Sequence, residues 1–317
     1  MKNFPRNAVI VLLLLLVTGG TFFYLRPLTV YDQLPRMQLW LQGVHSRYVH
    51  AGQYRIHYFE ALPPADLPDR PLVLVHGLGS KAEDWGPLIA PLAKQGFHVY
   101  VLDLLGYGRS DRPLDASYSI AEETAVLEQW MDTLHLGQVD MMGWSMGGWI
   151  ALKFTLDHPE RVRRIAVYDS AGIYFPMPFR IDLFHPSSPA ALQELVNVLE
   201  PNPVRLPDFV ARDYIRRKQQ DGWVVDRGMA AMTSGHDLLD FRLAALKQPL
   251  LIVWGSVDRL TPPTVGETMH RMVPQSVLET VSGCGHLSPR ECSDRILPPT
   301  VEFFNANPPL RAGEKSF

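Results

Sequence analysis

Three residues of the chain, Ser145, Asp258 and His286, have types and settings suited to nucleophilic catalysis. Ser145 is the centre of Gly143-Trp-Ser-Met-Gly147, which lies between an apolar segment that predicts a buried strand and an apolar segment with helical spacing. Glycines two residues to either side of the serine permit a sharp turn from strand to helix. That turn would present the hydroxyl at the N-terminus of a helix, where developing negative charge is favoured.

A serine hydroxyl is a weak nucleophile and needs a general base, which in turn needs an orienting acid. Asp258 and His286 follow Ser145 in the chain, and each lies just after an apolar segment that predicts a strand. We expect His286 to accept the proton of Ser145 and Asp258 to hold the imidazole in its tautomer. Asp169, which follows another predicted strand, is the alternative acid, and Asp103 is a weaker one.

Residues 71–79 predict a strand that runs into a His-Gly loop. A backbone N–H of this loop can point at the serine and, with the N–H of Met146, form an oxyanion hole. We assign the loop donor to Leu78, with Gly79 as the alternative. His76 is expected to shape the turn rather than to take part in catalysis.

Together with Asp103-Leu-Leu-Gly-Tyr-Gly-Arg-Ser110, these motifs make residues 44–305 resemble the α/β-hydrolase superfamily, specifically its esterase and lipase-like members with a helical cap. The resemblance implies a mostly parallel central sheet flanked by helices, with the core in residues 44–170 and 248–305. It also implies a helical cap, residues 171–247, inserted after strand six, and acyl transfer that requires no cofactor. Residues 306–317 are expected to form a C-terminal tail, and no spacing in the sequence suggests a metal site.

Apolar side chains in the expected cap are candidates for a substrate pocket. Tyr174, Phe175 and Met177 are the cap residues in question, and Trp144 lies beside the nucleophile. The alternative role for each of them is packing within the protein. Helix-like runs around residues 189–199 and 208–220 support a helical cap.

Composition excludes one class of function. The net charge of −3 and the pI near 6.4 provide no basic surface of the kind that nucleic-acid binding requires. His45, His50 and His57, in a predicted hairpin, are expected to face solvent. Whether Cys284 and Cys292 form a disulfide is left open, because the sequence does not give their Cα separation.

Residues 7–25 contain no formal charge and, as a helix, would span about 28 Å, close to the hydrocarbon thickness of a bilayer. We expect residues 1–26 to be a membrane anchor and residues 27–43 a juxtamembrane connector, with Met37, Leu39, Trp40 and Leu41 at the interface. Lys2 and Arg6 precede the apolar segment, which places the catalytic domain on the extracytoplasmic side. The alternative is a signal peptide, cleaved to release a secreted protein.

The expected activity is hydrolysis of lipid-like or other apolar carboxylic esters. Epoxide hydrolases and haloalkane dehalogenases of this fold have an aspartate where Ser145 stands, so the serine disfavours both. Two alternatives remain: a serine-dependent C–C bond hydrolase of ring-cleavage diketones, and a non-catalytic binding protein on a hydrolase scaffold. The sequence does not give the natural substrate or the oligomeric state.

Overall fold

A computed structural model describes residues 6–67 and 69–317, and in it the strands form one sheet with the order β1-β2-β4-β3-β5-β6-β7-β8-β9. Strand β2 runs antiparallel to both of its neighbours, and from β4 to β9 adjacent strands are parallel. The fold is therefore the mostly parallel α/β arrangement that the sequence predicts. The strands are β1 (His45–Ala51), β2 (Tyr54–Ala61), β3 (Arg70–Val75), β4 (Phe97–Leu102), β5 (Val139–Trp144), β6 (Val162–Tyr168), β7 (Leu250–Gly255), β8 (Val277–Val281) and β9 (Gly313–Ser316).

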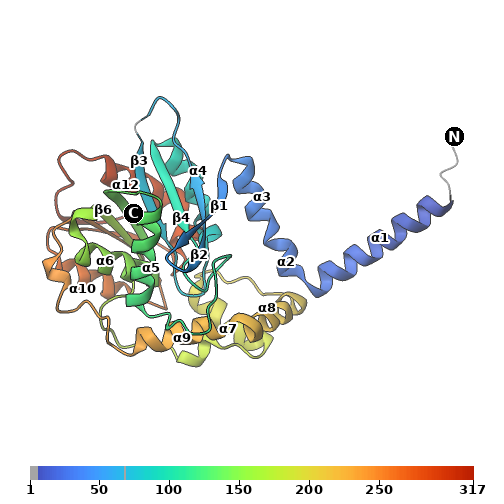
Figure 1. Ribbon diagram of the computed structural model, residues 1–317. Coiled ribbons are helices and arrows are strands. Elements are labelled where there is room, and N and C mark those ends of the chain that lie inside the picture. Colours follow the sequence, from blue (N-terminus) through green and yellow to red (C-terminus); the bar gives the residue numbers. More distant parts are fainter. Residues whose placement is uncertain (1–5, 68) are drawn as a thin grey trace.

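Helices cover both faces of the sheet (Figure 1). Every residue of β4, β5 and β7 is buried, as expected for parallel strands covered on two sides. Helices α5 (Ile120–Thr133), α6 (Met146–Asp157) and α10 (Pro263–Met272) contribute to the apolar core on one face. Helices α4 (Gly86–Lys94) and α12 (Ser293–Asn305) contribute to the core on the other, and the short α11 (Ser288–Glu291) packs against both of them.

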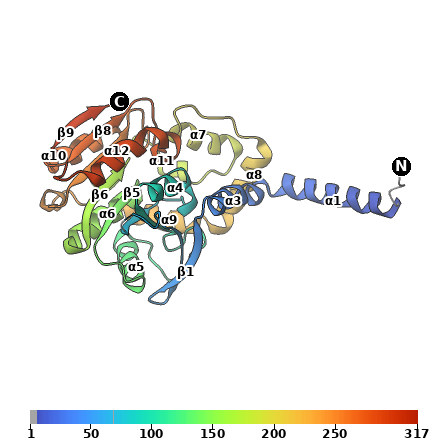
Figure 2. The same ribbon diagram turned by 90° about the horizontal axis from the view of Figure 1, so that it is seen from above.

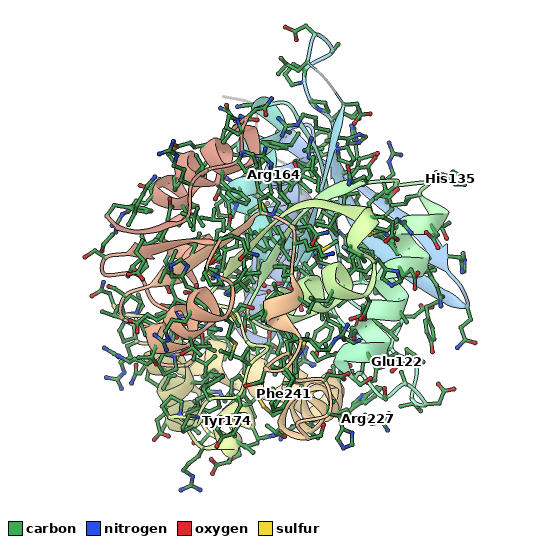
Figure 3. All side chains as sticks on the ribbon, turned by 90° about the vertical axis from the view of Figure 1, so that its left-hand side faces the viewer. Glu122, His135, Arg164, Tyr174, Arg227 and Phe241 are labelled. Atoms are coloured by element: carbon green, nitrogen blue, oxygen red, sulfur yellow. A yellow bond between two sulfur atoms is a disulfide. The ribbon has the colours of Figure 1, made fainter. Side chains whose placement is uncertain are left out.

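The cap is inserted between β6 and β7, where the resemblance placed it. It contains the short 3₁₀ turns η3 (Ile181–Phe184) and η4 (Leu243–Ala245) and the helices α7 (Pro189–Leu199), α8 (Asp208–Asp221) and α9 (Trp223–Thr233). Ser188 caps α7 by accepting a hydrogen bond from Ala191 N–H, which explains where that helix begins. Tyr174, Arg227 and Phe241 lie at the cap end of the molecule, well away from Arg164 near the start of β6 (Figure 3).

The N-terminal helix α1 (Arg6–Leu25) extends away from the rest of the protein in both views (Figures 1 and 2). Its residues Ala8–Leu25 have a mean hydropathy of 2.4 and none of them is buried. Among the residues that the structure describes, this is the one helix long and apolar enough to cross a membrane. Lys2, used above for the orientation, lies outside the described residues.

Two short helices, α2 (Pro27–Tyr31) and α3 (Gln33–Leu41), connect α1 to the sheet. In α3 the side chains of Met37, Trp40 and Leu41 are exposed, as expected for a connector at an interface. Leu39 is the exception: it is 2% exposed and packs in the core beside α4, because its helix face is turned toward the domain.

The C-terminal segment differs from the expected tail. Residues 313–316 form β9, which pairs in parallel with β8 at the edge of the sheet. Its sequence, Gly-Glu-Lys-Ser, is wholly exposed, so backbone hydrogen bonds rather than an apolar pattern hold it there. Before it come the last two helices, α11 and α12, which are separated by Cys292.

Candidate active site

Ser145 occupies the turn between β5 and α6 with φ 55° and ψ −120°, a conformation that few non-glycine residues adopt. The glycines on either side of Ser145 are required because there is no room for a Cβ atom at their positions. A Cβ atom on Gly147 would collide with the carbonyl oxygens of Val75 and His76, and one on Gly143 would collide with the backbone of Gly147. The Ser145 N–H donates to the carbonyl of Tyr168 at 2.9 Å. The neighbouring strands therefore hold the serine in one position.

The structure brings Ser145, His286 and Asp258 together at the carboxyl ends of the parallel strands. The Ser145 Oγ lies 3.0 Å from His286 Nε2, and His286 Nδ1 lies 2.8 Å from Asp258 Oδ2. All three residues are 9% exposed or less. These are the distances that proton transfer from a serine to an oriented imidazole requires.

Asp258 is fixed by the loop that follows it. The N–H groups of Leu260 and Thr261 donate to its Oδ1 at 2.8 and 3.0 Å, and the Thr261 hydroxyl donates to its Oδ2 at 2.7 Å. The Thr261 Oγ1 also lies 3.1 Å from His286 Nδ1. The sequence interpretation did not include Thr261, and its position three residues after the aspartate is the only sequence signal that points to it.

Electrostatics favour the doubly protonated imidazolium form of His286. Burial lowers the pKa of the imidazole, but the charge of Asp258 and its hydrogen bond raise it, and the net result is a raised pKa. Asp169, the alternative acid, accepts a hydrogen bond from Gly255 N–H at 2.7 Å instead of bonding to the imidazole. Burial and the nearby Asp258 charge raise the pKa of Asp169 well above its usual range. The hydrogen bonds therefore make Asp258, and not Asp169, the partner of His286.

The loop after β3 lies against the serine. A Cβ atom on Gly77 would stand 3.1 Å from the Ser145 Cβ, and Leu78 lines the same cavity as the serine. His76 shapes this loop, as expected: its Nδ1 lies 2.8 Å from Gly77 O, and its Nε2 accepts a hydrogen bond from Leu104 N–H at 3.1 Å. Burial lowers the pKa of His76, which suits a neutral ring that accepts a hydrogen bond.

His57 and Asp103 form a separate buried pair away from the site. His57 was expected to face solvent, but it is fully buried, and its Nδ1 lies 2.7 Å from Asp103 Oδ2. The reason is that the loop 103–110 covers this part of β2, with Ser110 Oγ accepting a hydrogen bond from His57 N–H. Asp103 also accepts from Ala82 N–H at 2.7 Å. Its carboxylate therefore joins two loops and does not contact His286.

Cys284 and Cys292 are joined by a disulfide, with a Cα separation of 6.4 Å. This answers the question that the sequence left open. Cys284 lies two residues before His286, so the bridge ties the loop that carries the imidazole to the start of α12.

A cavity of about 790 Å³ extends from Ser145 and His286 into the cap. This is toward the upper end of the roughly 300–1,000 Å³ that small-molecule sites occupy. Its lining includes the four residues expected for a pocket, Trp144, Tyr174, Phe175 and Met177. Trp144 is 4% exposed and also packs, because its Nε1–H donates to His286 O at 2.8 Å.

The cavity also has walls that the sequence did not suggest. Helix α9 contributes Val225, Met229 and Met232, and at the far end the lining includes Leu28 and Tyr31 of α2. No motif marks these residues, because only the folded chain brings the juxtamembrane helix beside the cap.

Comparisons with known proteins agree with this architecture. A family model described as alpha/beta hydrolase fold matches residues 70–222. A 2-hydroxymuconate semialdehyde hydrolase of Pseudomonas putida is 30% identical over 238 residues, covering 71% of this chain and 84% of that protein. A 2-hydroxy-6-oxononadienedioate/2-hydroxy-6-oxononatrienedioate hydrolase of Burkholderia vietnamiensis is 26% identical and covers 83% and 96% of the two chains.

Solved structures show the same fold. A membrane phospholipase A superimposes with a TM-score of 0.78 at 24% identity, covering 95% of this chain and 100% of that one. A meta-cleavage product hydrolase of Pseudomonas fluorescens superimposes with a TM-score of 0.71 at 24% identity, covering 82% and 97%. The sheet order, the cap between β6 and β7 and these relatives lead to one assignment: the chain belongs to the α/β-hydrolase superfamily.

Proposed function

We propose that the protein is a carboxylic ester hydrolase that acts on lipid-like or other apolar acyl esters. The observation that carries the proposal is the hydrogen-bonded series Ser145, His286 and Asp258 at the base of a large, mostly apolar cavity. An acyl chain fits such a cavity without leaving buried polar groups unpaired.

In the proposed mechanism His286 Nε2 takes the proton of Ser145 as the serine oxygen attacks the ester carbonyl. Asp258 holds the ring and stabilises the imidazolium that forms. The backbone N–H groups of Leu78 and Met146 bind the oxyanion, a contribution of about 2.7–4 kcal/mol for one such donor. The alcohol leaves with the proton from His286, and a water activated by the same nitrogen then releases the acid.

The N-terminal helix α1 supports both a lipid-like substrate and a location at a membrane. We propose that α1 is an uncleaved anchor that holds the catalytic domain on the extracytoplasmic side of a membrane. The disulfide between Cys284 and Cys292 is consistent with this side, because disulfides persist in oxidising compartments. Release after signal cleavage is the alternative, and the mass of the mature protein would distinguish the two.

A chain-length series tests the activity. The full-length protein in detergent is offered p-nitrophenyl esters of increasing acyl length, with Ser145→Ala as the matched variant. We expect turnover by the wild type and a loss of roughly 10⁴-fold or more in the variant, since nucleophile removal costs about this much in serine hydrolases. A wild type that neither cleaves these esters nor labels with a fluorophosphonate would instead fit a non-catalytic binding protein.

The second candidate function is C–C bond hydrolysis, and the curated relatives favour it. These relatives are hydrolases of 2-hydroxymuconate semialdehyde and of 2-hydroxy-6-oxo dioates. The same nucleophile and base would serve this reaction. Loss of the absorbance of a 2-hydroxy-6-oxo-dienoate, measured beside the ester series, decides which substrate class has the higher kcat/KM.

A further inference from the structure

One end of the catalytic cavity reaches the helix that follows the membrane segment. Leu28 and Tyr31 of α2 line it, and Tyr31 is 55% exposed, so the cavity meets the surface there. Leu28 is three residues beyond Leu25, the last residue of α1. Three residues span at most about 11 Å, so this end of the cavity lies close to the point where α1 would leave a bilayer.

The cap helix α8 lines the same end of the cavity, packs directly against α2 and is also held against α1. Its Phe209 stacks on Tyr24 of α1 with ring centroids 5.5 Å apart. Its buried Asp213 accepts a hydrogen bond from Leu28 N–H at 3.1 Å. Figure 1 shows α8 beside the bend between α1 and α2. α2 and α8 are therefore both held in place at the end of the domain from which α1 extends.

Basic side chains outnumber acidic ones in the cavity lining, although the chain as a whole carries −3. Carboxylates outside the lining pair with three of the cations: Glu83 with Arg36, Asp213 with Arg217 and Asp226 with Lys218. The lining contains six basic residues, Arg36, Lys81, Arg112, Arg217, Lys218 and Arg290, and three acidic ones, Asp32, Asp84 and Asp221. At the α2 end, Lys81 Nζ and Arg217 Nη1 each lie 2.7 Å from the carboxylate of Asp32. Arg217 Nε also lies 3.9 Å from Asp213 Oδ2, and Asp213 is shared with Arg216. Three cations and two carboxylates therefore meet at this end and leave one net positive charge, which suits an anionic ligand.

We infer that the end of the cavity lined by α2 and α8 admits membrane lipids with an anionic, phosphate-bearing headgroup directly from the bilayer, so that the acyl chain passes toward Ser145 while the headgroup remains at Lys81 and Arg217. This rests on the proposed ester hydrolysis and names its substrate class. Apolar walls accept the chain, basic residues at the rim accept the headgroup, and the position of the rim removes the need for the lipid to cross water. Hydrolysis then releases a fatty acid and a lysolipid.

The route is tested with the full chain reconstituted in vesicles of ether-linked phosphatidylcholine, which contain no carboxylic ester bond. Ester-linked phosphatidylglycerol is supplied either in the same vesicles or in separate ones, and released fatty acid is measured by mass spectrometry. Direct entry predicts at least tenfold faster release when enzyme and lipid share a membrane. Equal rates in the two arrangements would overturn the route.

The headgroup site is tested by the ratio of phosphatidylglycerol to diacylglycerol hydrolysis at matched acyl chains. Arg217→Gln should lower this ratio roughly tenfold, because a charge-assisted contact is lost. Arg212→Gln is the matched control: it removes a charge from the same helix, but Arg212 does not line the cavity. A ratio that does not change in Arg217→Gln, or that changes equally in Arg212→Gln, would overturn the assignment.

Two further measurements keep the result interpretable. Lys81→Gln tests the same site if Arg217→Gln does not fold, with folding judged by circular dichroism and by fluorophosphonate labelling of Ser145. Hydrolysis of soluble p-nitrophenyl butyrate by the wild type reports on ester hydrolysis itself. Activity on that ester without any preference for the anionic lipid would contradict this inference and leave the proposed function standing.

Discussion

His286 is set up as a base by the partners of its two ring nitrogens. Asp258 accepts from Nδ1, while the Thr261 hydroxyl is occupied as a donor to Asp258 Oδ2 at 2.7 Å. With the proton on Nδ1, Nε2 is left as the acceptor that faces the Ser145 hydroxyl at 3.0 Å. Asp169, whose pKa is raised by burial, accepts from Gly255 N–H and makes no hydrogen bond to the imidazole. The tautomer therefore follows from Asp258 alone.

The raised pKa of His286 predicts the pH dependence of activity. Catalysis needs the neutral imidazole, so kcat/KM should fall as pH falls through a midpoint above the ordinary value of 6.5. In Asp258→Asn the charge that raises the pKa is gone, and the midpoint should move to lower pH while the rate drops by roughly 10⁴-fold. The measurement is kcat/KM for a soluble ester from pH 4 to 9. The midpoint of this pH profile does not depend on the amount of active enzyme, so the slow variant can be compared with the wild type.

Asp103→Asn is the matched control, because Asp103 is an equally buried carboxylate bound to a different histidine, His57. Its midpoint should equal that of the wild type. An unshifted midpoint in Asp258→Asn would contradict the assigned origin of the raised pKa.

At the scale of elements, the disulfide is a brace for the loop between β8 and α11. It closes the segment from Cys284 to Cys292, which contains His286. We predict that Cys284→Ser combined with Cys292→Ser lowers stability by about 2 kcal/mol, at the lower end of typical disulfide contributions because the closed loop is short. Differential scanning calorimetry should show a decrease of a few degrees in Tm.

Reduction gives an independent check of the same brace. The chain has only these two cysteines, so a thiol reductant acts on no other bond in it. Reduced wild type should match the double variant in Tm, and the double variant should not respond to reductant. A Tm that is the same in all three samples would show that the loop is held by its other contacts.

The elements whose position and type could be predicted from the sequence are those buried on both sides. Strand β7 is an uninterrupted apolar run, and β5 is apolar around a single charged residue, Asp140. The glycines around Ser145 mark the turn, so the nucleophile and its neighbours were predictable. Strand β9 was not, because its four exposed polar residues are held by backbone hydrogen bonds. The prediction that His57 faces solvent was wrong because the loop 103–110 packs over this residue. The alternation of apolar and polar residues along β2 cannot indicate such a tertiary contact.

At the scale of the whole molecule, three distant parts of the chain make the substrate cavity. The core supplies Ser145 and His286, the cap supplies apolar walls, and α2 lines one end. The cap helix α8 packs against α7 and α9 within the cap and against α1 and α2 outside it. We therefore predict that the position of the cap wall depends on α1 and α2.

Phe209→Ala tests this dependence, because it removes the ring that lies 5.5 Å from Tyr24 and 6.1 Å from Phe23. An aromatic pair contributes roughly 0.5–1.5 kcal/mol, so amide exchange in residues 208–221 should become about two- to tenfold faster in vesicles. Phe241→Ala, which truncates a fully exposed ring of the cap, should leave exchange in α8 unchanged. The acceleration should disappear when the wild type and Phe209→Ala are compared after removal of α1, since Tyr24 is then absent from both proteins. A difference that persists without α1 would mean that Phe209 stabilises the cap through contacts of its own, and the anchor would then have no part in positioning the wall of the cavity.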